Sequence, residues 1–256
     1  MTRHVANVVI SGASTGIGRA FAQLYLRRGA VVGLMARRGY LLQDLAQSYP
    51  GQVFIYELDV RDAPALKVAA QDFHTHAGAA DLVIANAGVS AGTITEQVDD
   101  NAVFEEVMAI NVRGMMQTFQ AFLPAMRARA HGTLVGIASV AGFRGLPGAG
   151  AYSASKAAAI AYLESLRVEL CGSSIAVVTL CPGYVVTPMT EHNPYSMPFI
   201  LSADEATRRM VRLIDRRRRF AVVPWQMAIV GSVLRWLPCW LFDALFRRAP
   251  RKPRRV

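Results

Sequence analysis

The sequence predicts an α/β protein built on a doubly wound parallel sheet, and three observations support this class. Its 256 residues suit one α/β domain with a sizeable core. Hydrophobic residues make up 53% of the chain and charged residues 18%, which excludes a disordered protein. Short β-branched runs alternate with longer helical patterns, and this alternation predicts right-handed βαβ crossovers.

Seven runs have the length and composition of strands: residues 5–11, 30–36, 52–60, 81–88, 132–139, 174–183 and 220–224. Most are apolar throughout, as expected for parallel strands covered on both faces by helices. Helical patterns lie between them over residues 16–29, 62–77, 101–130 and 153–171. The strand and helix patterns together predict a single Rossmann-like domain over residues 1–224, with a C-terminal extension over 225–256. Ligands bind such sheets beyond the carboxyl ends of the strands.

The first expected strand is followed by a glycine-rich loop, SGASTGIG. Gly12, Gly16 and Gly18 have a GxxxGxG spacing. This spacing allows a sharp turn, close approach of the backbone to a pyrophosphate, and a helix N-terminus that faces the anion. Glycine also serves ordinary strand-to-helix turns. The place of the loop between the first strand and the first helix favours a nucleotide site.

The residues after the second strand, MARRGY, bear on the choice of cofactor. NAD sites usually have an acid here to accept hydrogen bonds from the ribose hydroxyls, whereas a 2′-phosphate favours guanidinium groups. Ala36 stands in the acid's place, and Arg37 and Arg38 follow it. Two solvated arginines at a helix start are the alternative interpretation. The pattern predicts NADP(H).

Asp59 and Val60 follow the third strand. At this position they are expected to hold the adenine of the cofactor. The alternative for Asp59 is that it caps the helix that follows.

A tyrosine and a lysine four positions apart stand in the stretch AYSASKAAA. If this stretch is helical, Tyr152 and Lys156 face the same cleft, one turn apart. A free phenol has a pKa of about 10, and a nearby ammonium stabilises phenolate and lowers that pKa. Tyr152 would then be a usable general acid and base. A surface tyrosine and lysine on an alanine-rich helix is the alternative.

Ser139 favours the catalytic interpretation of Tyr152 and Lys156 over the surface one, because it follows the fifth strand and its hydroxyl can hydrogen-bond a substrate carbonyl. With it, the chain resembles the short-chain dehydrogenase/reductases, in their common branch of this length. The matching pieces cover residues 5 to about 190 in the family's order: SGASTGIG, Asp59 and Val60, ANAG at 85–88, Asn111, Ser139, YSASK at 152–156 and PGYVVT at 182–187.

This resemblance implies hydride exchange between a nicotinamide and a carbonyl or alcohol carbon. Tyr152 would pass the proton, Lys156 would bind the nicotinamide ribose and lower the tyrosine pKa, and Ser139 would hold the substrate oxygen. Asn111 would keep a water on Lys156 for proton relay. The implied cofactor contacts are Gly12, Ser14, Thr15, Gly16, Ile17, Gly18, Arg37, Arg38, Asp59, Val60, Asn86, Ala87, Gly88, Tyr152, Lys156, Pro182, Gly183, Val185 and Thr187.

Two positions depart from the family pattern. Ser11 stands where the family usually has threonine, and Ala85 where its first asparagine often lies. Ser11 retains a hydroxyl, and Asn86 follows Ala85. Neither departure removes a catalytic group.

Other chemistry finds little support. The three cysteines, Cys171, Cys181 and Cys239, are far apart and are expected to be buried, reduced thiols. The five histidines form no metal-ligand pattern, and His74 and His76 suit the polar face of a helix end. The arginines at 216–219 lack an accompanying nucleic-acid recognition motif, so a solvated helix end is expected there instead.

An NADP(H)-dependent carbonyl reductase or alcohol dehydrogenase is therefore expected, and a non-catalytic NADP(H) sensor or a membrane-docked scaffold is the alternative. Residues 189–201 fall where the family keeps its mobile substrate lid, and their Met, Tyr, Phe and Ile side chains favour an apolar substrate. Relatives usually form homo-oligomers through the helices at 101–130 and 153–171. No signal peptide is evident, so a cytoplasmic protein is expected.

The C-terminal part carries most of the positive charge. Residues 206–256 hold 14 Lys and Arg against 2 Asp and Glu, whereas residues 1–205 hold 14 against 16. Residues 220–246 are apolar but are interrupted by Arg235, Pro238 and Asp243, which disfavours a bilayer span. Three tryptophans and flanking arginines suit the lipid headgroup boundary. Peripheral attachment to the cytoplasmic face of a membrane through 225–256 is expected. The alternative is that the tail covers the substrate cleft or forms a subunit interface.

Overall fold

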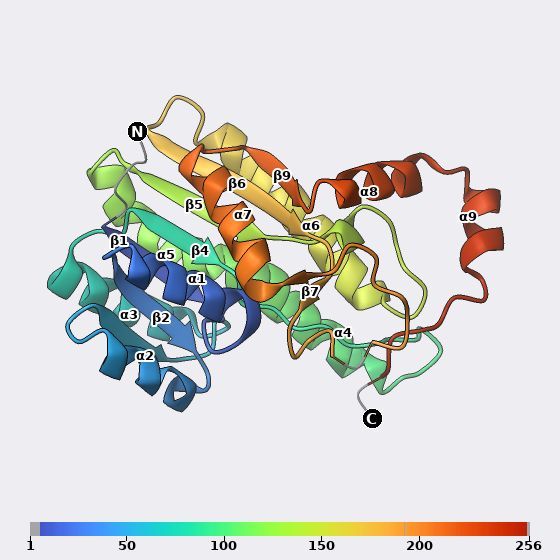
Figure 1. Cartoon of the computed structure of the whole chain (residues 1–256), viewed down its shortest axis with the longest axis horizontal. Helices are drawn as coiled ribbons and strands as arrows, with labels where there is room; N and C mark the ends of the chain where they lie inside the picture. The colour runs from blue at the N-terminus through green and yellow to red at the C-terminus, as the bar shows by residue number, and fades with distance from the viewer. Residues whose placement is uncertain (1–5, 192, 255–256) are drawn as a thin grey trace.

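The computed structural model describes residues 6–191 and 193–254, and its centre is a seven-stranded parallel sheet (Figure 1). The strand order is β3-β2-β1-β4-β5-β6-β9. The strands are β1 Asn7–Ser11, β2 Val31–Ala36, β3 Val53–Glu57, β4 Leu82–Ala85, β5 Gly132–Ile137, β6 Ile175–Pro182 and β9 Phe220–Val223. This confirms the predicted doubly wound fold. The strand order reverses between β1 and β4, which opens a crevice at their carboxyl ends.

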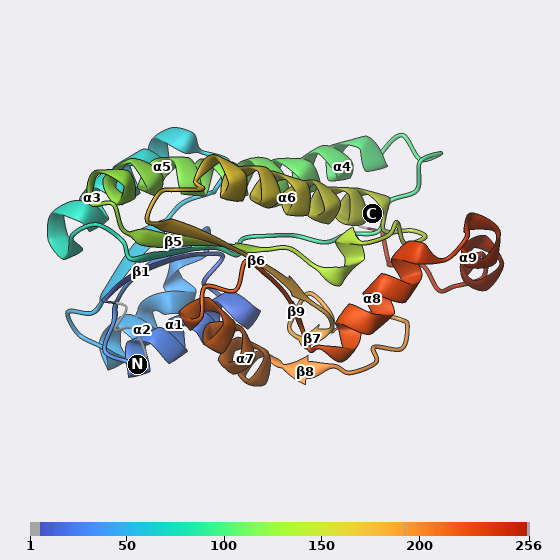
Figure 2. The same ribbon diagram turned by 90° about the horizontal axis from the view of Figure 1, so that it is seen from above.

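Helices cover both faces of the sheet (Figure 2). One face carries α1 Gly16–Arg27, the turn η1 Gly39–Leu42, α2 Gln43–Ser48 and α7 Ala203–Asp215. The other carries α3 Ala63–Ala77, α4 Asp100–Met108, α5 Gly114–Ala128 and α6 Gly150–Glu169. Alternate residues of a strand enter the two cores. Ile10 packs on the α1 side and Val9 on the α5 side, and both are fully buried.

The helix expected over 101–130 is interrupted. Between α4 and α5 lies a π-helical segment, η2 Ala109–Arg113, and its Asn111 is completely buried. A π turn inside an α-helix often marks a functional position. The helix expected to start at residue 153 begins at Gly150, so Tyr152 lies in its first turn rather than just before it.

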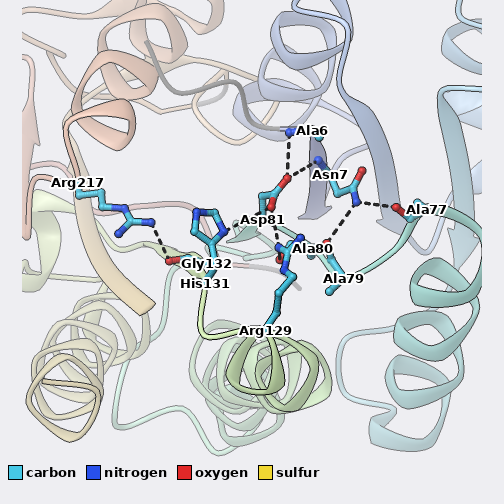
Figure 3. Close-up of polar contacts among 10 residues, drawn as sticks. All are labelled: Ala6, Asn7, Ala77, Ala79, Ala80, Asp81, Arg129, His131, Gly132 and Arg217. Atoms are coloured by element: carbon cyan, nitrogen blue, oxygen red, sulfur yellow. Dashed lines mark hydrogen bonds and ion pairs between the residues drawn. The ribbon is translucent and has the colours of Figure 1, made fainter. Parts of the chain in front are cut away.

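Asp81 organises the amino ends of the central strands, opposite the crevice (Figure 3). Its carboxylate accepts from the backbone amides of Ala6 and Asn7, at 3.0 Å each, and from Arg129 at 2.6 Å. Arg217 donates to the carbonyl of Gly132 nearby. The alignment of the strands at this end therefore depends on the Asp81 carboxylate, which accepts charge-assisted hydrogen bonds from the backbone of the β1 segment and from Arg129.

The C-terminal extension packs onto the domain rather than standing apart from it. Helix α8, Gln226–Trp236, packs beside β9 and beside the short helix η3, Val140–Gly142. Arg144 donates to the carbonyls of Leu234 and Leu237 at 2.8 and 2.6 Å and stacks on Phe242 of α9, Cys239–Phe246. After α9 the chain returns towards α4 (Figure 1). Within the described ranges no single helix has the length and apolarity to cross a bilayer; α8 and α9 have them together but are bent by 116°.

The expectation of three buried cysteines is wrong for two of them. Cys181 lies on the central strand β6 and is buried, whereas Cys171 and Cys239 are exposed. Both exposed thiols stand at helix ends, Cys171 just after α6 and Cys239 at the start of α9, where side chains face solvent. His74 and His76 lie in the last turn of α3, as expected. Across residues 6–191 and 193–254, no group of His, Cys, Asp and Glu could hold a metal ion.

Candidate active site

A cavity of about 690 Å³ opens at the carboxyl ends of β1, β2, β3 and β4. This volume lies within the range of cofactor and ligand sites. It is lined by most of the residues predicted to bind a dinucleotide: Gly12, Ser14, Thr15, Gly16, Ile17, Arg37, Arg38, Asp59, Val60, Asn86, Ala87, Gly88 and Thr187. The elements thus bring together residues that are up to 175 positions apart in the sequence.

The glycine-rich loop fits closely against the loop after β4. Gly12 and Gly16 have φ angles of +66° and +56°, a region that favours glycine. A Cβ on Gly12 would lie 2.7 Å from the Cα of Ala87, and one on Gly16 would lie 3.0 Å from Thr187. Side chains at these glycines would narrow the cavity where the N-terminus of α1 begins, and a helix N-terminus of this kind is suited to an anion.

Ser11 and Asn86 hold these two loops together. The Ser11 hydroxyl accepts from the backbone amides of Asn86 and Ala87 at 3.1 and 3.2 Å. The Asn86 amide donates to the carbonyls of Ser11 and Gly12, at 3.1 Å each. A hydroxyl suffices for this contact, so serine in place of the family's threonine leaves it intact.

Arg37 and Arg38 are both exposed at the rim of the cavity, directly after β2. Arg37 lies 4.0 Å from the carboxylate of Asp59, which is paired more closely with Arg61 at 2.7 Å. The hydrogen bonds from Arg61 hold the pKa of Asp59 below its ordinary value. The alternative that Asp59 caps α3 is wrong, because Asp62 is the capping residue and accepts from Ala65.

Tyr152 and Ser139 meet at the carboxyl end of β5 and β6. Ser139 is buried, and its hydroxyl accepts from the amide of Ala141 at 3.1 Å, lies 3.5 Å from the carbonyl of Pro182, and is near enough to the Tyr152 phenol to affect its pKa. Burial raises the pKa of Tyr152, and the neighbouring Ser139 hydroxyl opposes that rise.

Lys156 is buried one turn further along α6. Its ammonium donates to the carbonyl of Ile137 at 2.9 Å and lies 5.8 Å from the centre of the Tyr152 ring. Desolvation lowers the pKa of Lys156 to about 8. The structure therefore differs from the expectation that this ammonium lowers the pKa of Tyr152. The cost of burying a phenolate outweighs the attraction of a lysine that is itself desolvated and directed at a backbone carbonyl.

Asn111 ties the π-helical segment to the cleft. Its side chain exchanges two hydrogen bonds with the backbone of Val89, at 2.8 and 3.0 Å, and donates to Ser155 at 2.9 Å. A Cβ on Gly88 would lie 3.2 Å from the Asn111 oxygen and 3.6 Å from the Lys156 ammonium. The glycine therefore keeps open the space between these two polar groups.

Some predicted cofactor residues lie outside the cavity lining: Gly18, Tyr152, Lys156, Pro182, Gly183 and Val185. Gly18 packs against the carbonyl of Gly12, and the side chain of Val185 lies in the core. Sequence reasoning missed other lining residues, notably Ser90 and Lys252, Pro253 and Arg254, whereas Met189 belongs to the segment predicted to be a substrate lid. Ser90 follows the ANAG stretch and could have been found there. No sequence signal placed the C-terminal residues in the cleft.

Known proteins resemble this chain over most of its length. A family model described as short chain dehydrogenase matches residues 6–196. An uncharacterized oxidoreductase of Myxococcus xanthus is 40% identical over 243 residues, which are 94% of this chain and 96% of that protein.

Two solved structures share the fold. A short chain dehydrogenase/reductase from Burkholderia phymatum in complex with NAD has a TM-score of 0.82 and 23% identity, with full coverage of both chains. An alcohol dehydrogenase from Thermococcus sibiricus complexed with 5-hydroxy-NADP has a TM-score of 0.75 and 27% identity, covering 85% of this chain and 95% of that one.

Proposed function

Because this chain belongs to the short-chain dehydrogenase family, we propose that it is an NADP(H)-dependent oxidoreductase acting on a carbonyl or secondary alcohol. The observation that carries the proposal is the meeting of Tyr152, Ser139 and Lys156 beside a dinucleotide-sized cavity. Gly88, which lines the cavity, adjoins the Lys156 ammonium, which a Cβ on this glycine would approach to 3.6 Å. NADPH bound there supplies the hydride. Every other part of the reaction falls to the side chains of the protein.

In the direction of reduction, Tyr152 donates its phenolic proton to the substrate oxygen as negative charge develops on it. The raised pKa of Tyr152 keeps the phenol protonated and ready to donate. Ser139 holds the same oxygen by a hydrogen bond, and Lys156 would hold the nicotinamide ribose of a bound cofactor. Asn111 positions the π-helical turn and Val89 beside Lys156, where a water for proton relay would be held. In oxidation each proton moves the other way.

A preference for NADP(H) is supported by the two arginines at the rim. Arg37 and Arg38 are exposed there, and Ala36, at the end of β2, offers no carboxylate. Guanidinium groups can bind a 2′-phosphate through charge-assisted hydrogen bonds. Arg61 pairs with Asp59, the carboxylate 4.0 Å from Arg37, so the negative charge of Asp59 repels a phosphate there less strongly.

An apolar substrate body is supported by the segment after β6. Met189 lines the cavity, and Met189, Phe199 and Ile200 are all substantially exposed on this segment. Assembly into a homo-oligomer through α4, α5 and α6 is supported by exposed Phe104 and Val168 on these helices. Nothing in the site indicates a nucleic-acid partner.

Peripheral membrane contact is proposed for α8 and α9. Trp225, Trp236 and Trp240 are 65%, 83% and 71% exposed, and Ile229 and Val233 are exposed between them. Such side chains suit the interface of a bilayer. Part of the basic charge of the tail faces inward, because Arg254 pairs with Asp100. The lipid attraction must then come from the other arginines near these helices.

The proposed function is tested by adding NADPH and a panel of ketones and aldehydes to the purified protein and following NADPH absorbance. Oxidation of NADPH with at least one carbonyl compound is expected, with a lower rate for NADH. Tight binding of NADPH without turnover on any member of a broad panel would favour the alternative, a nucleotide sensor.

A further inference from the structure

Residues 252–254 line the cavity, and we call residues 251–254 the C-terminal strap. The amide of Gly92 donates to the carbonyl of Pro253 at 2.9 Å, and Gly92 and Arg254 form an isolated parallel β-bridge. Figure 1 shows the chain leaving α9 and returning to this side of the molecule. The strap is therefore attached through its backbone to the loop after β4.

An ion pair with a buried carboxylate anchors the end of the strap. The Arg254 guanidinium donates to both carboxylate oxygens of Asp100, at 3.1 and 3.0 Å. The Asp100 side chain is only 5% exposed, and it also accepts from the amide of Ile94 at 2.7 Å. Removing one partner would leave a buried charge unpaired, so the pair fixes the strap strongly.

Two glycines make room for the strap. A Cβ on Gly92 would collide with the carbonyl of Lys252, and a Cβ on Gly148 would lie 2.7 Å from the Cβ of Arg251. Gly92 belongs to the loop after β4 and Gly148 to the segment before α6. The strap thus fits closely between the two loops.

Lys252 places an ammonium beside the reacting centre. Its Nζ donates to the Ser90 hydroxyl at 2.8 Å and lies 5.7 Å from the centre of the Tyr152 ring. Lys156 lies 5.8 Å from the same ring. Lys252 and Ser90 both line the cavity, and Lys252 is partly buried. The catalytic phenol therefore has two ammonium groups near it, one from its own helix and one from the strap.

We propose that the C-terminal strap is a wall of the substrate site and that Lys252 is a specificity-determining residue that binds an anionic group of the substrate. The inference rests on the proposed function, because the carbonyl to be reduced is taken to bind at Tyr152. A carboxylate a few bonds from that carbonyl is the simplest group that Lys252 can reach. With the apolar residues near Met189, the site fits an amphipathic carbonyl compound with an acidic end.

The cofactor phosphates are a less suitable partner for this lysine. The glycine-rich loop and the two rim arginines serve the pyrophosphate and adenosine end of the cavity, at β1 and β2. Lys252 lies over the ring of Tyr152, at the end where hydride transfer takes place. A partly buried charge-assisted hydrogen bond is also stronger and more selective than one at an open rim.

The test compares keto acids of increasing chain length with their methyl esters, which keep the carbonyl and lose the charge. Binding to the NADP⁺ complex is measured by isothermal titration calorimetry, and turnover is measured separately. Lys252→Met keeps the length of the side chain and removes the ammonium. Arg248→Met, at an exposed position near the end of α9, is the matched control for loss of one positive charge.

At least one acid should bind the original protein more tightly than its ester, and Lys252→Met should reduce that ratio about tenfold. Affinity for NADPH should remain within about twofold, and Arg248→Met should leave the ratio unchanged. Asp100→Asn, which weakens the anchor of the strap, should reduce the ratio in the same direction.

The inference is overturned if no acid is preferred, if Lys252→Met leaves the ratio as it was, or if this variant loses NADPH affinity as strongly as acid affinity. Absence of turnover with selective acid binding would contradict the proposed function and leave the role of Lys252 standing. Turnover without acid selectivity would support the proposed function and contradict the role of Lys252.

Discussion

The ammonium of Lys156 donates to the carbonyl of Ile137 at 2.9 Å, inside the carboxyl end of the sheet. The side chain is 4% exposed, and burial lowers the pKa of Lys156 to about 8 from an ordinary 10.5. The folded protein therefore holds this proton less tightly than the unfolded chain does. Below pH 8 the lysine is charged in both the folded and the unfolded state, so burying its charge lowers the free energy of unfolding by the full amount.

Lys156→Met should consequently raise the free energy of unfolding at pH 7, by on the order of 1–3 kcal/mol, while turnover is lost. The gain should shrink as the pH rises from about 8 towards 10.5, because the original protein sheds its buried charge over that range. Urea denaturation followed by circular dichroism at several pH values measures both effects. A gain that stays constant with pH would contradict the electrostatic explanation.

Tyr152→Phe should keep the fold and the affinity for NADPH and lower turnover by about 10²- to 10⁴-fold, because the ring remains and the proton donor is lost. Tyr162→Phe removes a phenol from the same helix, away from the cavity lining, and should leave turnover unchanged. Steady-state kinetics and NADPH titration check both. Comparable rates in the two variants would exclude Tyr152 as the proton donor.

Arg37→Ala combined with Arg38→Ala should reduce the preference for NADPH over NADH at least about tenfold, since each charge-assisted phosphate contact contributes about 1.5–3 kcal/mol. Arg37 should account for most of the change. Arg27→Ala, an exposed arginine at the end of α1, is the control for net charge. An unchanged ratio of the two affinities in the double variant would mean that the rim arginines do not contact the 2′-phosphate.

Trp236→Ser combined with Trp240→Ser should weaken binding to anionic vesicles at least about tenfold, because two exposed apolar side chains are lost from the bilayer contact. Both side chains are exposed, so the fold should be retained. Tyr40→Ser, an exposed aromatic elsewhere, is the control. Flotation at low and high salt measures the effect. Original protein that never floats with anionic vesicles would favour a subunit interface at α8 and α9.

The sheet and the tight turn of the glycine-rich loop were predictable because their signals are local. Apolar β-branched runs indicated buried parallel strands, and the glycine spacing after β1 indicated a tight turn at the start of a helix. Tyr152 and Lys156 were predictable for a similar reason, since a four-residue spacing fixes one helix face. The π-helical turn at Asn111 carries no such signal, because it depends on packing against Val89 and Ser155.

Long-range contacts account for what the sequence did not reveal. The strap reaches Ser90 and Asp100 from more than 150 positions away, and its basic residues were indistinguishable from a lipid-facing tail. Residues 252–254 line the cavity, which agrees with the alternative in which the tail packs over the cleft. The direction of the Tyr152 pKa shift also escaped prediction, because it depends on the balance between desolvation and charge in the folded cleft.

The placement of Trp225, Trp236 and Trp240 has a practical consequence for spectroscopy. They are the only three tryptophans in the chain, and all lie on or beside α8 and α9 with most of their surface exposed. Intrinsic fluorescence therefore starts from the red-shifted emission of hydrated indole and responds little when the sheet unfolds. The same property makes it a selective reporter of docking, since only a lipid surface or another protein that covers these helices would shift the emission to the blue.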